Sequence, residues 1–278
     1  MNILEKIITQ KQIEVEERKS LYPKKLLEQS IYFNSPTVSF KKYLLREDKV
    51  GIIAEFKRKS PSKGFINQYA DIERTSIGYM QGGASALSIL TDTEFFGGKN
   101  ADLITARKFN YCPILRKDFI IDEYQILEAK SIGADVVLLL ANVLSTKQIK
   151  DFSQLAKSLG LEVLLEIRDK EELQSVNELV DVVGVNNRNL KDFTTNISQS
   201  IELAALIPSD FIKISESGID SAAIVQELKS VGYKGFLIGE LFMKQSRPEL
   251  ACNNFIKEIT ALQTSLLSGN KKSEFKNK

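Results

Sequence analysis

The amino-acid sequence predicts an α/β protein, a (β/α)8 TIM barrel with an N-terminal helical extension. Two observations lead to this prediction. From residue 51 onward, eight strand-like apolar runs alternate with eight helical patterns, and the connections between them are short. This alternation indicates parallel βαβ units, and eight units favour a closed barrel. A doubly wound open sheet is the alternative, but the glycine-rich turn that usually follows its first strand is replaced here by a charged turn.

The chain begins with a helical extension over residues 1–50. Apolar residues from Ile3 to Val15 recur at helical spacing and predict a helix over residues 3–19. A shorter helical stretch follows at residues 24–29. We expect this extension to pack on the barrel that follows it.

The barrel itself is expected over residues 51–265. Its predicted strands lie at residues 51–56, 86–90, 113–116, 136–140, 162–165, 182–185, 211–214 and 235–238. Its predicted helices lie at residues 72–81, 101–109, 123–131, 146–159, 170–178, 197–206, 222–231 and 248–265. Gly160 at the end of one helix and Pro248 in the first turn of the last helix agree with these boundaries. Residues 266–278 are rich in lysine, serine and asparagine, and they predict a disordered basic tail.

Composition limits the possible functions. The net charge of +2 gives no reason to expect a nucleic-acid or membrane partner. Because the chain has no long apolar segment and starts with a charged amphipathic stretch, we expect a cytoplasmic protein, most simply a monomer. The sequence has no histidine and only two cysteines, Cys112 and Cys252, which excludes Cys/His catalysis and histidine-ligated metal sites and predicts free thiols. Acid and base steps must therefore use carboxylates or lysines.

The first predicted strand opens into a charged loop. Glu55 and Lys57 stand two residues apart and should share one face of the strand, where burial requires them to pair with each other or with a ligand. The turn that follows offers Ser60, Ser62 and Gly64 to an anion. A structural Glu/Lys pair on a half-exposed strand is the alternative interpretation.

Polar residues also follow most of the other predicted strands. They are Thr91 with Phe95 to Gly98, Lys117 to Phe119, Glu166, Asn186 to Arg188, Glu216 to Gly218, and Gly239 with Glu240. Each residue alone could be a surface charge, a helix cap or a turn residue. Barrel enzymes place their chemistry at the carboxyl ends of the strands, so the set together predicts an active site. The glycine turns after the seventh and eighth strands predict phosphate binding.

These motifs resemble those of one enzyme family. The blocks Ile53 to Ser62, Ala86 to Gly98, Pro113 to Asp122, Gly184 to Arg188, Ser215 to Gly218 and Phe236 to Gly239 stand in the order found in the indole-3-glycerol-phosphate synthase family. The resemblance runs from the N-terminal helix through the last barrel helix. It implies a lyase of tryptophan biosynthesis that acts on a phosphorylated small molecule, 1-(2-carboxyphenylamino)-1-deoxyribulose 5-phosphate. The enzyme would close the indole ring with loss of carbon dioxide and then water, and would need no metal or organic cofactor.

The resemblance also implies roles for individual residues. Lys117 would be the general acid of ring closure, and Glu166 would be an acid/base group in the dehydration. Lys57 would hold the substrate carboxylate, while Glu55 and Asn186 would orient hydroxyls and lysines. The implied substrate-binding residues are Arg188, Glu216, Phe96, Phe119 and Leu139. The implied phosphate-binding residues are Ser60, Ser217, Gly218, Gly239 and Glu240.

Two further expectations concern charge. Lys57 beside Lys117 should lower the pKa of at least one of these lysines, because like charges disfavour each other. Glu240 stands where some relatives have serine, and its carboxylate would repel a phosphate. We therefore expect only its backbone to serve the ligand and its side chain to turn outward.

Two other functions are open from the residues alone. One is a different phosphate-binding TIM-barrel enzyme, such as a ribulose-phosphate isomerase-like protein or a lysine Schiff-base aldolase. The other is a barrel that binds a ligand without turnover. The presence of Glu55, Lys57, Lys117 and Glu166 disfavours the second, because a binding module has no need of a complete acid/base set.

Overall fold

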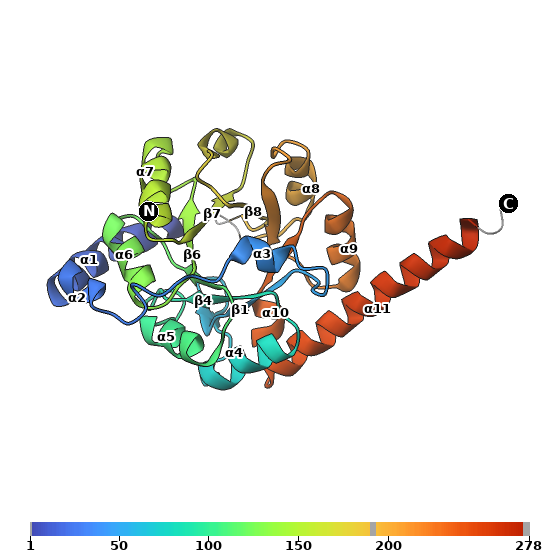
Figure 1. The fold of residues 1–278 in the computed structure, drawn as a ribbon, viewed down its shortest axis with the longest axis horizontal. Helices are drawn as coiled ribbons and strands as arrows, with labels where there is room; N and C mark the ends of the chain where they lie inside the picture. Colours follow the sequence, from blue (N-terminus) through green and yellow to red (C-terminus); the bar gives the residue numbers. More distant parts are fainter. Residues whose placement is uncertain (1, 190–192, 275–278) are drawn as a thin grey trace.

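Eight parallel strands form a closed barrel in the computed structural model, which describes residues 2–189 and 193–274. The strands follow one another around the barrel in the order β1-β10-β9-β8-β7-β6-β5-β4, and Figure 1 shows helices arranged around them. Their bounds are β1 Ile52–Phe56, β4 Ala86–Leu90, β5 Ile114–Lys117, β6 Val136–Leu140, β7 Glu162–Ile167, β8 Val182–Asn186, β9 Ile212–Glu216 and β10 Gly235–Ile238. The predicted (β/α)8 barrel is confirmed. A small hairpin, β2 (Lys59–Ser60) and β3 (Gly64–Phe65), lies in the loop after β1.

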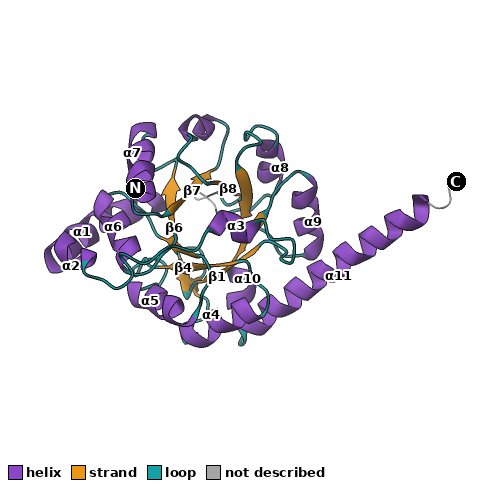
Figure 2. Ribbon diagram, in the orientation of Figure 1, coloured by secondary structure: helices purple, strands orange, loops and turns teal. Residues whose placement is uncertain are grey.

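The helices surround the barrel and also precede it (Figure 2). The N-terminal helices are α1 Ile3–Leu21, α2 Lys24–Glu28 and α3 Phe40–Leu44. The helices that follow are α4 Ile72–Gln81, α5 Asn100–Phe109, α6 Glu123–Ser131, α7 Thr146–Ser158, α8 Ser198–Ala204, α9 Ala222–Ser230, α10 Glu240–Met243 and α11 Pro248–Glu274. Among the described residues, none of the helices is long and apolar enough to cross a bilayer. Cys112 and Cys252 are buried free thiols, as predicted.

Two helices differ from the prediction. The segment after β7 forms only a short 3-10 helix, η1 (Glu171–Ser175). The chain turns directly after it, where the Asn177 side chain accepts a hydrogen bond from the Leu179 N–H at 3.1 Å. The last helix runs to Glu274 instead of ending at Ser265. Since the residues after 265 contain no proline, nothing in the covalent chain breaks the helix there. Residues 275–278 of the predicted tail lie outside the described residues.

The strands alternate between two apolar layers. Residues such as Ile52, Ala54 and Leu139 pack between the strands and the helices. Their neighbours, such as Ile53 and Leu138, fill the inside of the barrel together with Phe40 and Leu44 of α3. The inward positions near the carboxyl ends of the strands are polar instead, which creates a site at that end. They are Glu55 two residues after Ile53, Lys117 two after Leu115, Glu166 two after Leu164, and Glu216 two after Ile214.

The turn into β1 requires a glycine. Gly51 has a φ of +87°, and a β-carbon at this position would lie 2.2 Å from the carbonyl oxygen of Lys234. The Gly51 carbonyl also accepts the Phe236 N–H at 2.9 Å, so this turn joins β1 to β10. The chain cannot move away from the clash without losing that hydrogen bond.

We therefore expect Gly51→Ala to lower the free energy of unfolding by at least about 2 to 3 kcal/mol, because it adds a steric clash to the strain of a positive φ. Gly160→Ala is the matched control, since Gly160 has a φ of +74° but only a Thr37 oxygen at 3.9 Å. The control should lose only about 1 kcal/mol. Urea denaturation of both variants measures the difference, and equal losses would contradict the clash.

Candidate active site

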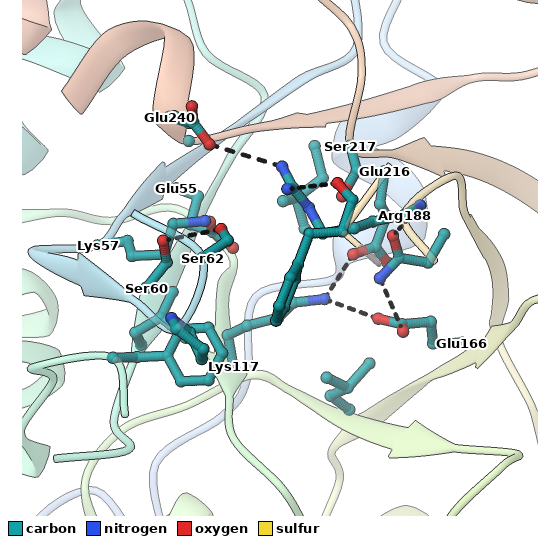
Figure 3. A pocket seen from close by; sticks show the side chains of 18 of the residues that line it. Glu55, Lys57, Ser60, Ser62, Lys117, Glu166, Arg188, Glu216, Ser217 and Glu240 are labelled. Carbon is teal, nitrogen blue, oxygen red and sulfur yellow. Dashed lines mark hydrogen bonds and ion pairs between the residues drawn. The ribbon is translucent and has the colours of Figure 1, made fainter. Parts of the chain in front are cut away.

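A pocket opens at the carboxyl ends of the strands and brings together almost all of the residues predicted for the site (Figure 3). The predicted residues that line it are Glu55, Lys57, Ser60, Phe96, Lys117, Phe119, Glu166, Asn186, Arg188, Glu216, Ser217, Gly218, Gly239 and Glu240. Leu139 does not contribute to the lining, so its prediction as a substrate contact is wrong. Its side chain is buried in the layer between the strands and the helices. Leu138 and Leu140 line the pocket in its place, because alternate residues of a strand face opposite sides.

Lys117 of β5 lies between a carboxylate of β7 and a carboxylate of β9, the strand opposite β5 in the barrel. Its Nζ is 3.0 Å from Glu166 Oε2 of β7 and 2.5 Å from Glu216 Oε2 of β9. Asn186 of β8 donates from Nδ2 to the other oxygen of Glu166 at 3.0 Å, which fixes the plane of that carboxylate. Figure 3 shows the side chains of Lys117, Glu166 and Glu216 pointing toward one another. The predicted grouping of Lys117, Glu166 and Asn186 is present in the structure.

The protonation of this cluster follows from its burial. Burial lowers the pKa of Lys117, but the Glu216, Glu166 and Glu55 carboxylates outweigh burial and raise the pKa above the ordinary lysine value. The predicted lowering by a neighbouring lysine is therefore wrong for Lys117, because its closest charges are carboxylates. Burial raises the pKa of Glu216 to about 7, although Lys117 opposes this shift. In Glu166, by contrast, Lys117 and Asn186 overcome burial and lower the pKa.

Glu55 and Lys57 form the second charged group of the pocket. Lys57 Nζ lies 2.7 Å from Glu55 Oε1, and the Glu55 side chain is 4% exposed. Of the two expected ways to compensate these charges, pairing with each other or with a ligand, the structure shows the first, and Lys57 directly follows β1. Gly239 lies against this pair: a β-carbon at that position would lie 2.4 Å from Glu55 Oε1. Gly239 therefore lets the buried carboxylate fit beside the start of α10.

The turn after β9 has an unusual backbone. Ser217 and the adjacent Gly218 both have positive φ values, 68° and 73°. The Asn187 side chain donates to the Ser217 carbonyl oxygen at 3.0 Å and to the Ser215 hydroxyl at 2.9 Å, and it holds the turn in this shape. A non-glycine residue rarely adopts such a φ, and strain of this kind is often found at ligand sites. Ser60 lies in the same pocket, with its hydroxyl 3.4 Å from that of Ser62.

The Glu240 side chain does not turn outward. Its carboxylate lies 3.5 Å from the Arg188 guanidinium, which approaches from the end of β8 (Figure 3). The expectation that it turns outward is wrong, because the carboxylate is attracted by Arg188, which is far from Glu240 in the sequence. Glu240 also stands in the first turn of α10, where an acidic side chain is favoured. Arg188 and Glu240 thus neutralise each other in the pocket.

Two neighbouring aromatic rings, Phe96 and Phe119, form an aromatic wall within the apolar lining of the pocket. The ring centroids of Phe96 and Phe119 are 5.8 Å apart. Ile3 and Ile7 of α1 also line the pocket, although the sequence suggested only that their helix packs on the barrel. Their spacing of four residues predicts a common face, but not what that face contacts. Asn142 and Phe193 are further lining residues that sequence reasoning missed, because both lie in loops with no distinctive pattern.

The described part of the chain holds no cluster of acidic, cysteine or histidine side chains suited to a metal ion. The ionisable side chains that line the pocket are lysines, carboxylates and one arginine. Lys117 and Lys57 can hold or donate protons and attract anions, and Glu166 and Glu216 can accept protons. The aromatic wall can bind a planar ring beside them.

Comparisons with known proteins point to one family. The model of the family "Indole-3-glycerol phosphate synthase" matches residues 4–255. The chain is 47% identical over 258 residues to the indole-3-glycerol phosphate synthase of Bacteroides thetaiotaomicron, and the match covers 93% of this chain and 99% of that protein. It is 42% identical over 246 residues to the same enzyme of Campylobacter jejuni, covering 87% of this chain and 95% of that protein.

Solved structures confirm the fold at low sequence identity. The 3-hexulose-6-phosphate synthase of Salmonella typhimurium superimposes with a TM-score of 0.60 at 14% identity, over 76% of this chain and 99% of that chain. A chain of the tryptophan synthase complex of Pyrococcus furiosus superimposes with a TM-score of 0.57 at 14% identity, over 77% of this chain and 99% of that chain. At such identities the likeness establishes the barrel and nothing beyond it.

The raised pKa of Glu216 predicts a pH-dependent stability. Its ordinary pKa of 4.5 rises to about 7 in the folded protein, so the folded state binds this proton more tightly than the unfolded state does. The stabilisation is complete below the ordinary pKa and is lost as the pH rises through the folded pKa. Glu216→Gln keeps a neutral side chain at every pH. We therefore expect the variant to gain stability relative to the wild type, by roughly 1 to 3 kcal/mol, between about pH 5 and about pH 8.

Urea denaturation of both proteins across this pH range measures the effect. A constant difference between the two proteins, or a difference of the opposite sign, would contradict the raised pKa. Glu227→Gln serves as the control, because Glu227 lies in the middle of α9, outside the pocket.

Proposed function

The chain belongs to the indole-3-glycerol phosphate synthase family, and we propose that the cluster around Lys117 carries out the reaction of this family. The enzyme is a carboxy-lyase of tryptophan biosynthesis that converts 1-(2-carboxyphenylamino)-1-deoxyribulose 5-phosphate to indole-3-glycerol phosphate. The observation that supports the proposed site best is the position of Lys117 between Glu166 and Glu216, beside an aromatic wall.

In the proposed ring closure, the ring carbon that bears the carboxylate attacks the ketone carbon of the sugar chain. Negative charge develops on the ketone oxygen, which takes a proton from the Lys117 ammonium. Lys117 is suited to this role because the two glutamates keep it protonated until the substrate arrives. The carboxylate then leaves as carbon dioxide, and its bonding electron pair returns to the ring.

The proposed dehydration removes the hydroxyl that ring closure created. The hydroxyl leaves as water after it receives a proton, and a base removes a proton from the carbon beside the nitrogen. Glu166 is placed to act here, because Asn186 orients it and Lys117 keeps it ionised. Lys57 would first hold the substrate carboxylate and then share proton transfer, with Glu55 as its partner at 2.7 Å.

We place the phosphate at the turns after β9 and β10. The left-handed turn at Ser217 and Gly218 and the start of α10 at Gly239 and Glu240 supply backbone N–H groups, and Ser60 faces the same pocket. The Phe96 and Phe119 rings would bind the substrate's benzene ring. A cytoplasmic location and a monomeric state are predictions from the sequence.

Removal of the Lys117 ammonium should abolish the reaction. We expect Lys117→Ala to lower kcat by at least about a hundredfold to a thousandfold, because ring closure loses its proton donor. Lys147→Ala on α7 is the matched control, since that lysine is 85% exposed and pairs with Asp151. Product fluorescence after mixing purified protein with the substrate measures the rate. Wild-type activity retained by Lys117→Ala would refute the assignment of the acid.

Neutralisation of Glu240 should improve phosphate binding. In the free protein the Glu240 carboxylate occupies Arg188 and repels the phosphate dianion, so Glu240→Gln removes both obstacles. We expect the KM for the substrate, and the inhibition constant of inorganic phosphate, to fall by roughly threefold to fivefold. Steady-state kinetics measures both constants. An unchanged or higher KM would mean that the phosphate does not approach the Arg188–Glu240 pair.

A further inference from the structure

Lys11 of α1 is a buried cation that has no part in the proposed proton transfers. Its side chain is 1% exposed, and its Nζ lies 2.9 Å from Asp118 Oδ1, 3.0 Å from Asp92 Oδ2 and 2.8 Å from Glu14 Oε2. An ammonium carries three N–H donors, so these contacts can use all of them. Burial lowers the pKa of Lys11, but the Asp118, Asp92 and Glu14 carboxylates outweigh burial and raise the pKa, so the side chain is charged.

Both barrel carboxylates that contact Lys11 hold the backbone of an aromatic residue in the pocket. Asp92 Oδ1 accepts the N–H groups of Phe95 at 2.8 Å and Phe96 at 3.1 Å. Asp118 Oδ1 accepts the N–H of Phe119 at 2.8 Å. The turns that present Phe96 and Phe119 are therefore each tied to a carboxylate, and Lys11 joins the two carboxylates.

The surroundings of Asp118 extend this connection toward the acid of the reaction. Asp118 directly follows Lys117, and its Oδ2 accepts hydrogen bonds from Thr91 Oγ1 at 2.6 Å and from the Arg116 guanidinium at 3.1 Å. Lys117 thus stands between Arg116 and Asp118, which form a buried ion pair with each other. The buried ion pairs limit the movement of this end of β5.

The face of α1 that carries Lys11 also contacts the pocket directly. Ile3, Ile7 and Lys11 are four residues apart and lie on one face of the helix. Ile3 and Ile7 line the pocket, and Lys11 binds the two turns behind the rings. One helix face therefore forms part of the pocket and holds the aromatic wall in place.

Attachment of α1 to the barrel does not by itself explain a buried lysine. Val15 already packs against Tyr124 and Leu127 of α6, and Arg18 and Lys19 form ion pairs with Glu128 and Asp122. Burying an ammonium costs several kcal/mol of desolvation free energy, and an apolar residue often replaces such a charge without loss of stability. An apolar residue, however, would leave Asp92 and Asp118 as neighbouring carboxylates without a shared cation.

We propose that Lys11 is a positioning residue of the active site, which fixes the Phe96 and Phe119 wall through Asp92 and Asp118 so that the substrate's ring is held against Lys117. The inference rests on the proposed function, because it takes these two rings as the surface that binds the benzene ring of the substrate. The N-terminal extension then contributes to substrate binding as well as to the stability of the barrel.

Lys11→Met tests this role, with Lys19→Met and Val15→Ala as matched controls on the same helix. Lys19→Met removes an ion pair to Asp122, and Val15→Ala loosens the packing of α1, but neither touches Asp92 or Asp118. We expect kcat/KM of Lys11→Met to fall by about tenfold to a hundredfold, mainly through KM, because a misplaced binding surface weakens substrate orientation. The controls should stay within about twofold of the wild type at a temperature where all three variants are folded.

A double-mutant cycle separates positioning from general loss of structure. In the Phe96→Ala background the wall is already incomplete, so Lys11→Met should change KM by less than about threefold. The same fold-change in both backgrounds, or an equal KM rise in Val15→Ala, would overturn the proposal. If Lys11→Met does not fold, Asp92→Asn replaces it: this variant keeps the acceptor for the Phe96 N–H, removes the charge that binds Lys11, and should still raise KM.

The two proposals fail in different ways. Absence of product formation by the wild-type protein would refute the proposed site and its reaction. Normal wild-type turnover with Lys11→Met behaving like Lys19→Met would refute only the positioning role of Lys11.

Discussion

The polar end of the barrel depends on one interaction, the ion triad in which the Lys117 ammonium lies between the Glu166 and Glu216 carboxylates. All three side chains are largely removed from water, so each charge must be compensated by the others. Burial raises the pKa of Glu216, and the neighbouring Glu166 carboxylate adds to this effect because two carboxylates share one ammonium. Glu216 Oε1 is buried without a hydrogen-bond partner among the described residues. The triad is thus arranged for proton transfer at the expense of stability.

The barrel can tolerate this loss of stability because its inner face has an apolar region and a separate polar region. Toward the amino ends of the strands the inner residues are apolar and pack against α3. Toward the carboxyl ends the same inward positions carry the lysines and glutamates. The alternation of strand residues makes the division possible, because a single strand supplies core packing at one position and a reactive group two residues later. Stability and chemistry therefore occupy different layers of one barrel.

The sequence predicts whatever depends on local pattern. Alternating strands and helices, inward pairs such as Glu55 and Lys57, and polar residues at strand ends all follow from short-range periodicity. The errors arise where the partner is far away in the sequence. The pKa of Lys117 depends on residues of β7 and β9, and the direction of Glu240 depends on Arg188. The family resemblance implied Leu139, which lies between the two lining residues Leu138 and Leu140, and in a strand that is apolar on both faces the pattern does not reveal which face points inward.

Contacts between residues far apart in the sequence also determine the role of α1, so the sequence pattern alone does not reveal it. The Phe96 and Phe119 rings stand on turns after β4 and β5, and turns lack the hydrogen-bond ladder that holds strand residues in place. Something outside the barrel must restrain them if the rings are to form a defined surface. Asp92 and Asp118 provide local restraint, but two like charges in a buried space repel each other unless a cation lies between them. Lys11 supplies this cation, and it comes from α1, which is not one of the barrel's own helices. The shape of the pocket therefore depends on the extension that precedes the barrel.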